Sequence, residues 1–189
     1  MSASEVLRRV SAALDHAGIA YMLTGSFASA HHGAPRSTLD IDIVIGANPE
    51  QLRTFVQSLP SGEYYVDMHA ALEAYKCESL FNVIDLATGW KIDLIIRKSR
   101  AFSQEEFGRR QLVKVQGLAL FVASAEDVVI AKLEWSKLAQ SQRQIEDVAA
   151  ILRLRRDSLD LPYLERWISE LNLATQWSDA KSIAAISER

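Results

Sequence analysis

The stretch from Leu39 to Ile45 constrains the fold more than any other part of the chain. Apolar residues alternate with acidic ones at its start, where Asp40 and Asp42 are separated by one isoleucine. Because successive side chains of a strand point to opposite faces, the apolar residues share one face and the two aspartates share the other. We therefore predict a strand with an apolar face in the core and two carboxylates about 7 Å apart on the opposite face.

The two carboxylates repel each other and need a stabilising partner. Their spacing suits Mg²⁺, which prefers hard oxygen ligands and keeps water and substrate phosphate oxygens in its coordination shell. A pair of such ions can activate an attacking oxygen and stabilise a leaving one. The alternative is that Asp40 and Asp42 belong to the solvated polar face of an amphipathic edge strand.

A third carboxylate, Asp93, interrupts the apolar run from Trp90 to Ile96, which we also predict to be a strand. A buried aspartate needs a partner. One interpretation is a salt bridge to Lys91, which lies on the same face of that strand. The other is that Asp93 completes a group of three carboxylates with the two aspartates of a neighbouring strand.

The turn Thr24-Gly25-Ser26 offers a second chemical feature. It ends the predicted buried strand over 19–24 and precedes a short predicted helix over 27–32. Glycine lets the backbone approach a ligand closely, and the amides at a helix start attract phosphate. A serine hydroxyl adds another hydrogen-bond donor. Taken alone, such a pair of residues is more often only a turn.

The remaining patterns indicate an α+β protein, with a mixed sheet flanked by helices and a helical C-terminal region. We predict a core over residues 1–123 and a helical region over 124–189 packed on it, because a helix-capping sequence starts at Ser124. Further predicted helices cover 4–16, 69–76, 142–154, 162–171 and 181–188, one begins at 48–49, and further strands cover 64–67, 81–86, 112–115 and 118–122.

Composition excludes several classes of protein. The 189 residues contain one cysteine, Cys77, which excludes an internal disulfide and a cysteine-rich metal site. A formal net charge of −3 argues against a protein coated in basic charge for non-specific nucleic-acid binding. No apolar run approaches the ~20 residues of a membrane span, and the N-terminus lacks the apolar core of a signal peptide. We therefore expect a soluble, cytoplasmic protein without a membrane partner.

Together, these features resemble the DNA polymerase beta-like nucleotidyltransferase superfamily. Its motif joins Gly-Ser at a helix start to an Asp-x-Asp strand and to a third carboxylate on a later strand. Here the motif is Gly25-Ser26, then Asp40-x-Asp42, then Asp93. The resemblance implies the nucleotidyltransferase fold for the predicted mixed sheet.

Two further resemblances extend over nearly the whole chain. The form Arg-x-Thr-x-Asp-x-Asp at 36–42 is similar to the minimal prokaryotic nucleotidyltransferases, including the abortive-infection type toxins. The segments 81–93 and 124–135 look like a bacterial family of nucleotidyltransferase-like proteins whose substrate is not assigned. The relatives therefore imply a reaction but no particular substrate.

The superfamily resemblance implies a role for each motif residue. Asp40 and Asp42 would hold two metal ions, Mg²⁺ or Mn²⁺, and Asp93 would bind the catalytic ion and help to orient or deprotonate the acceptor hydroxyl. The acceptor oxygen would attack the α-phosphate of a nucleoside triphosphate such as ATP in line, and pyrophosphate would leave. The residues implied in nucleotide binding are Gly25 and Ser26 at the β- and γ-phosphates, together with Arg36, Thr38 and Lys132.

The helical region contributes a secondary candidate, Asp147, which matches a recurrent acidic position of such families. Each of the outlying residues also has an ordinary interpretation. Asp147 could form a helix-surface ion pair with Arg143, four residues earlier. Lys132 could be a surface lysine that extends along apolar neighbours. Arg36 could neutralise phosphate or simply pair with the aspartates that follow it.

The acceptor is left open by the resemblance. We expect a tRNA or a protein side chain, as in toxin–antitoxin modules, with a protein antitoxin as partner. The alternatives are a small-molecule acceptor, as in antibiotic nucleotidyltransferases, and a nucleotide-binding regulatory module with little catalysis. An exposed sheet edge or the helical region could each support an oligomer.

Overall fold

The computed structural model describes residues 3–185, which form two compact units. The described part of unit 1 consists of residues 3–24 and 37–123, and that of unit 2 consists of residues 25–36 and 124–185. The chain therefore passes between the units at three points. The segment 25–36, which our boundary at 123 assigns to the core, groups with the C-terminal helices.

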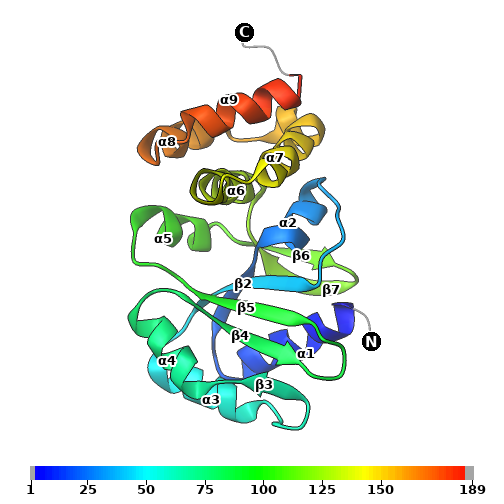
Figure 1. The fold of residues 1–189 in the computed structure, drawn as a ribbon, viewed down its shortest axis with the longest axis vertical. Helices are drawn as coiled ribbons and strands as arrows, with labels where there is room; N and C mark the ends of the chain where they lie inside the picture. Colours follow the sequence, from blue (N-terminus) through cyan, green and yellow to red (C-terminus); the bar gives the residue numbers. More distant parts are fainter. Residues whose placement is uncertain (1–2, 186–189) are drawn as a thin grey trace. The chain divides into compact units, whose positions relative to one another are not determined.

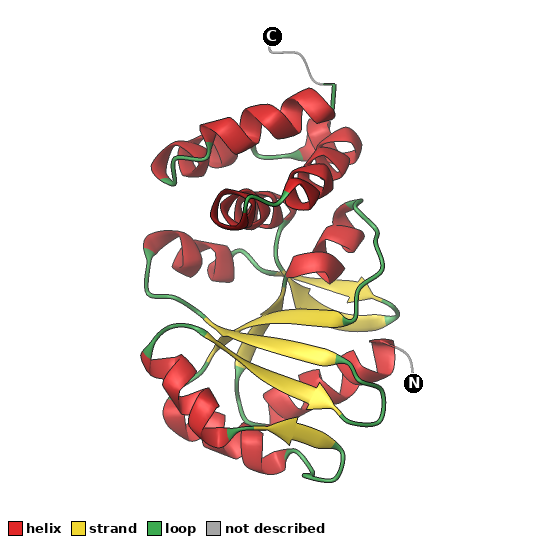
Figure 2. Ribbon diagram, in the orientation of Figure 1, coloured by secondary structure: helices red, strands yellow, loops and turns green. Residues whose placement is uncertain are grey.

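Unit 1 is built on a mixed sheet, drawn in yellow in Figure 2. Within the described residues this sheet has seven strands, in the order β3-β4-β5-β2-β1-β7-β6. β2 runs parallel to β5 and β1 runs parallel to β7, whereas the other neighbouring pairs are antiparallel. The predicted α+β class with a mixed sheet is confirmed. The strands are β1 (Ala20–Leu23), β2 (Asp40–Gly46), β3 (Tyr64–Val66), β4 (Leu80–Asp85), β5 (Lys91–Ile96), β6 (Gln111–Val115) and β7 (Leu118–Val122).

The strand that carries two aspartates, β2, lies in the middle of this sheet. Ile41, Ile43 and Ile45 are buried on one of its faces, as the alternation predicts. Leu39 is an exception, because we predicted it on the apolar face, whereas the strand begins at Asp40 and Leu39 is 66% exposed. Alternation fixes burial only inside the strand, so a residue that precedes it is not held against the core.

Helices flank both faces of the sheet within unit 1. In Figure 1, α1, α3 and α4 lie on one side of the sheet, and α5 lies on the other. These helices are α1 (Ala3–His16), α3 (Pro49–Ser58), α4 (Met68–Lys76) and α5 (Ala101–Gly108).

The start of α3 shows how closely local sequence determines one helix boundary. The Gln51 backbone N–H donates to Asn48 Oδ1 at 2.9 Å, and the Asn48 backbone N–H donates to Gln51 Oε1 at 3.0 Å. This reciprocal cap satisfies two backbone donors at the helix start. The helix predicted to begin at Asn48 and Pro49 is therefore confirmed.

Unit 2 is helical, and α2 packs against α6 and α7. α6 begins after the predicted cap, where the Ser124 side chain accepts from the Asp127 backbone N–H. The predicted last helix over 181–188 falls partly on residues 186–189, which lie outside the described residues. No helix within 3–185 is long and apolar enough to cross a membrane. The helices are α2 (Gly25–His32), α6 (Ala125–Ala139), α7 (Gln142–Arg155), the 3₁₀ helix η1 (Arg156–Ser158), α8 (Leu161–Glu170) and α9 (Ala174–Ile183).

The turn after α2 provides a test of packing in unit 2. Gly33 has a φ of +117°, which L side chains rarely adopt, and a Cβ there would overlap the Leu154 side chain. We expect Gly33→Ala to lower the free energy of unfolding by about 1–3 kcal/mol, measured by urea denaturation. Gly62→Ala is the matched control, since a Cβ at Gly62 meets nothing within 4 Å. Equal losses in the two variants would contradict the packing argument.

Candidate functional site

Three carboxylates lie on one face of the sheet in unit 1. Asp42 of β2 stands directly opposite Asp93 of β5 in the parallel register, and Asp40 stands opposite Lys91. Residues paired across neighbouring strands point to the same face. The structure therefore brings together, within one unit, the three aspartates that the sequence analysis singled out. We call this surface the carboxylate face.

The Lys91 ammonium lies between two of these carboxylates. Its Nζ is 3.1 Å from Asp93 Oδ2 and 3.4 Å from Asp40 Oδ1. The hydrogen bond to Asp93, together with the negative charges of Asp93 and Asp40, raises the pKa of Lys91. The salt bridge that we considered as an alternative role for Asp93 is therefore present, beside the in-register carboxylates that the functional interpretation requires.

Asn82 of β4 holds the other oxygen of Asp93. Its Nδ2 donates to Asp93 Oδ1 at 2.5 Å, and the two residues are paired across the antiparallel strands β4 and β5. Both oxygens of Asp93 thus have a donor, which fixes the side-chain rotamer. Sequence reasoning missed Asn82. The available signal was an amide between apolar neighbours, Phe81 and Val83, in the first strand of a predicted hairpin.

A divalent cation suits the carboxylate face by donor chemistry. Asp40, Asp42 and Asp93 offer carboxylate oxygens, which Mg²⁺ and Mn²⁺ prefer. A cationic group, the Lys91 ammonium, already contacts two of them. Among residues 3–185, however, no three His, Cys, Asp or Glu side chains converge as a group that could hold an ion. The carboxylates share a face, but two of them are turned toward the lysine.

The predicted glycine turn follows β1. The Thr24 backbone N–H donates to the Asp42 carbonyl oxygen at 2.9 Å, which joins the end of this unit 1 segment to the carboxylate strand. Gly25 is the next residue in the chain and the first of α2, with a φ of +58° that favours glycine. Ser26 is buried, and Ser29 Oγ donates to the Gly25 carbonyl oxygen at 2.7 Å. The predicted order of strand, glycine and helix is confirmed, but α2 begins at Gly25 itself rather than after the turn, where we predicted a helix over 27–32.

Thr38 lies where the chain enters β2. Its Oγ1 accepts a hydrogen bond from the Asp40 backbone N–H at 3.1 Å. This contact fixes the backbone at the first residue of the carboxylate strand. The family resemblance implied that Thr38 binds nucleotide. The structure gives it a structural contact as well, which the resemblance did not imply.

A second group of polar side chains lies in unit 2, and we call it the Lys132 cluster: Arg36, Lys132, Gln144 and Asp147. Lys132 Nζ donates to Asp147 Oδ2 at 2.6 Å and to Gln144 Oε1 at 2.9 Å. Arg36 Nε lies 3.2 Å from the same Asp147 oxygen. The Lys132 side chain is 5% exposed and that of Asp147 is 11% exposed. Two of the predicted residues, Arg36 and Lys132, thus contact a third, Asp147.

The Lys132 cluster corrects two ordinary interpretations from the sequence. Lys132 is not a surface lysine, because its side chain is buried and its ammonium is bound by Asp147. Asp147 is not on a solvated helix surface beside Arg143, because its carboxylate is buried among Lys132 and Arg36. The spacing along one helix could not show this, since the partners come from α6 and from the segment after α2.

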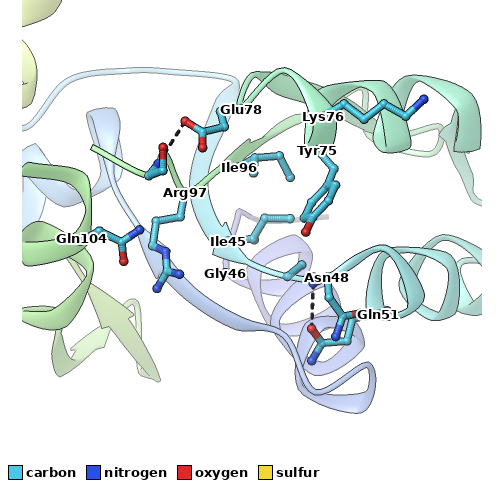
Figure 3. A pocket seen from close by; sticks show the side chains of 12 residues that line it. Ile45, Gly46, Asn48, Gln51, Tyr75, Lys76, Glu78, Ile96, Arg97 and Gln104 are labelled. Carbon is cyan, nitrogen blue, oxygen red and sulfur yellow. Dashed lines mark hydrogen bonds between the residues drawn. The ribbon is translucent and has the colours of Figure 1, made fainter. Parts of the chain in front are cut away.

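A cleft of about 510 Å³ lies at the other end of the carboxylate strands (Figure 3). It is lined by the last residues of β2 and β5 and by Arg97, whose guanidinium lies 5.2 Å from the centre of the Phe107 ring. Asp40 and Lys91, by contrast, begin these two strands. The lining residues, all in unit 1, include none of the predicted site residues. The cleft and the carboxylate face are therefore separate features of the sheet.

The sequence match over almost the whole chain decides the family. Residues 3–187 match a family described as nucleotidyltransferase of unknown function (DUF6036). The chain belongs to this nucleotidyltransferase family. Membership confirms the resemblance drawn from the Gly-Ser and Asp-x-Asp motifs. No curated protein sequence matches the chain.

Three solved structures share the fold of this family member. The antibiotic-resistance factor ANT(2″)-Ia in solution is 13% identical, with a TM-score of 0.56 and coverage of 95% of this chain and 97% of that one. An antigenic nucleotidyltransferase-like protein from Paracoccidioides brasiliensis is 17% identical, with a TM-score of 0.54 and coverage of 100% and 96%. The lincosamide antibiotic adenylyltransferase LnuA, with lincomycin bound, is 12% identical, with a TM-score of 0.55 and coverage of 80% and 96%. The predicted nucleotidyltransferase fold is confirmed.

Proposed function

We propose that the protein transfers a nucleoside monophosphate from a nucleoside triphosphate to an acceptor hydroxyl, with Mg²⁺ or Mn²⁺ bound at the carboxylate face. One observation carries the proposal. Asp42 and Asp93 are paired in register on neighbouring strands, with Asp40 on the same face, in a member of a nucleotidyltransferase family. The family supplies the class of reaction, and the metal, the nucleotide and the acceptor are our inference.

The three aspartates are the proposed metal ligands. A divalent cation bound by them would neutralise charge on the triphosphate and stabilise the leaving pyrophosphate. Asp93 has a further proposed role, because Asn82 holds its Oδ1 in place and its carboxylate can orient the acceptor hydroxyl and accept its proton. The acceptor oxygen bonds to the α-phosphorus as the bond from that phosphorus to pyrophosphate breaks.

Gly25 and Ser26 are the proposed contacts of the triphosphate. Gly25 has no side chain and begins α2, and the backbone N–H groups at a helix start attract phosphate. Within the Lys132 cluster, the Arg36 side chain is 22% exposed and is the member suited to reach a phosphate. Lys132 and Asp147 are then positioning residues that orient the Arg36 guanidinium.

For the acceptor, we favour a small molecule over the tRNA or protein that the sequence led us to expect. The fold of this chain is similar to that of ANT(2″)-Ia in complex with adenylyl-2″-tobramycin, with a TM-score of 0.57 and coverage of 97% of that chain. LnuA was solved with another antibiotic, lincomycin. The net charge of −3 also disfavours a polyanionic tRNA and suits a cationic acceptor.

The test is transfer of a radioactive label. The purified chain is incubated with Mg²⁺ and each of four α-³²P nucleoside triphosphates, in separate reactions with hydroxyl-bearing antibiotics, total RNA or cell protein. We expect label on a small molecule, and none with the Asp40→Asn/Asp42→Asn variant. Label on RNA or protein would instead support the macromolecular acceptor.

A second candidate is a nucleotide-binding module with little catalysis. The observation that favours it is the Lys91 ammonium, which contacts two of the proposed metal ligands, Asp40 and Asp93. Calorimetry distinguishes the two candidates. A nucleoside triphosphate that binds in the presence of Mg²⁺ but gives no labelled product in any reaction would establish the module and contradict the transferase.

A further inference from the structure

Lys91 bridges two of the carboxylates that we propose as metal ligands. Its Nζ lies 3.4 Å from Asp40 Oδ1 on β2 and 3.1 Å from Asp93 Oδ2 on β5. A divalent cation held by Asp40 and Asp93 would bind the same two carboxylates. The ammonium and the metal ion therefore compete for one position.

Lys91 and Lys132 each form an ion pair with aspartate, and their exposure shows which of the two can move. The Lys132 side chain is 5% exposed and is enclosed with Asp147. The Lys91 side chain is 42% exposed, and that of Asp40 is 54% exposed. Ion pairs that face water are weak, because solvent screens them and hydrates the released charges. Lys91 can thus leave its partners at little cost, whereas Lys132 cannot.

We propose that Lys91 is an internal counter-ion of the carboxylate face, which a divalent cation displaces when it binds. The inference rests on the proposed function, since it takes the three aspartates as metal ligands. Without metal, the ammonium offsets the mutual repulsion of Asp40, Asp42 and Asp93. When a divalent cation arrives, it takes the oxygens of Asp40 and Asp93, and the flexible Lys91 stem carries the ammonium into solvent.

This exchange sets a threshold that the affinity of an incoming ion must exceed. A monovalent cation brings the same charge as the ammonium and gains little by replacing it. A divalent cation brings twice that charge and interacts more strongly with the carboxylate oxygens. Lys91 thereby weakens the binding of all free cations at the carboxylate face and leaves divalent ions favoured over monovalent ones.

Binding of Mn²⁺ tests the proposal without any measurement of activity. The paramagnetic signal of free Mn²⁺ gives the dissociation constant for the full chain and for Lys91→Met, which removes the charge and keeps most of the stem. We expect Mn²⁺ to bind about fivefold more tightly to Lys91→Met, the most that an exposed ion pair supports. Lys91→Arg, which restores the charge, is expected to return the affinity toward that of the wild type.

Lys114→Met is the matched control. Lys114 is exposed on β6, at the far edge of the same sheet, and its loss changes the net charge equally. We expect this variant to bind Mn²⁺ as the wild type does. Equal tightening in both methionine variants would show a general effect of charge and would overturn the counter-ion role.

Two other outcomes separate this inference from the proposed function. If the wild type binds Mn²⁺ and Lys91→Met binds it equally or less well, the counter-ion role is overturned and the metal site stands. If neither protein binds Mn²⁺ while both unfold cooperatively on heating, the metal site itself is overturned, and the role of Lys91 with it.

Discussion

Replacing Asp93 with asparagine is expected to slow nucleotidyl transfer by about 10³-fold. The substitution keeps the side-chain volume and an oxygen that can accept from Asn82. It removes the negative charge that we propose to bind metal and to accept the proton of the acceptor hydroxyl. Initial rates of label transfer at saturating nucleotide and Mg²⁺ measure the effect.

The matched control for this substitution is Asp15→Asn. Asp15 is an exposed carboxylate on α1 in the same unit, so its loss should leave the rate within about twofold. The circular dichroism spectrum of each variant should match that of the wild type. A fall of less than about tenfold for Asp93→Asn, with the fold intact, would rule out its role as base and ligand.

The second large effect concerns stability. We expect Asp147→Ala to lower the free energy of unfolding by about 3–5 kcal/mol, because it removes the carboxylate that pairs with the buried Lys132 ammonium. Lys132 would keep only the Gln144 side chain among the contacts described above, and Arg36 would lose the carboxylate that orients it. Urea denaturation gives the value, and a loss below about 1 kcal/mol would contradict the buried ion pair.

A double variant separates stability from function. Lys132→Met/Asp147→Leu replaces the buried pair with apolar side chains of similar size, and we expect it to recover most of the lost stability. If stability returns without transfer activity, the Lys132 cluster serves the reaction by orienting Arg36. If both return, the cluster is structural alone.

Arg143→Ala tests the surface interpretation of Asp147 and should change stability by less than about 0.5 kcal/mol.

Local sequence predicted the parts of the fold that depend on neighbouring residues. The alternation of β2 and the reciprocal cap at Asn48 are both properties of a few consecutive residues. α5 was not predicted, because Phe102 and Phe107 do not form an amphipathic stripe along it. Phe107 instead lies close to Gly46, where an added Cβ would come within 3.3 Å of the ring. That contact joins distant parts of the chain and leaves no local pattern.

In the candidate site, too, some features depend on neighbouring residues and others on contacts between distant parts of the chain. Asp40 and Asp42 share a face by alternation alone, and the sequence suffices for that. The register that sets Asp42 opposite Asp93 depends on the pairing of β2 with β5, two strands with several elements between them in the chain. The contact of Lys132 with Asp147 likewise depends on how α6 packs against α7. Residue patterns raised the grouping of Asp93 with Asp40 and Asp42 as one of two interpretations, and the family resemblance supported it. Nothing in the sequence predicted the contact of Lys132 with Asp147.

Unit 2 joins an early segment of the chain to the C-terminal helices. During synthesis, α2 is therefore made well before the helices against which it packs. A nascent chain that has reached Ala123 contains every strand of the sheet, but not α6 and α7, against which α2 packs. The carboxylate face can therefore form before the glycine turn has its supporting helices. A truncation after Ala123 would not release a minimal catalytic core, because it would strip buried residues of α2, such as Phe27 and Ala28, of their cover. Helices from the second half of the chain, α6 and α7, thus complete a turn that was synthesised near the beginning.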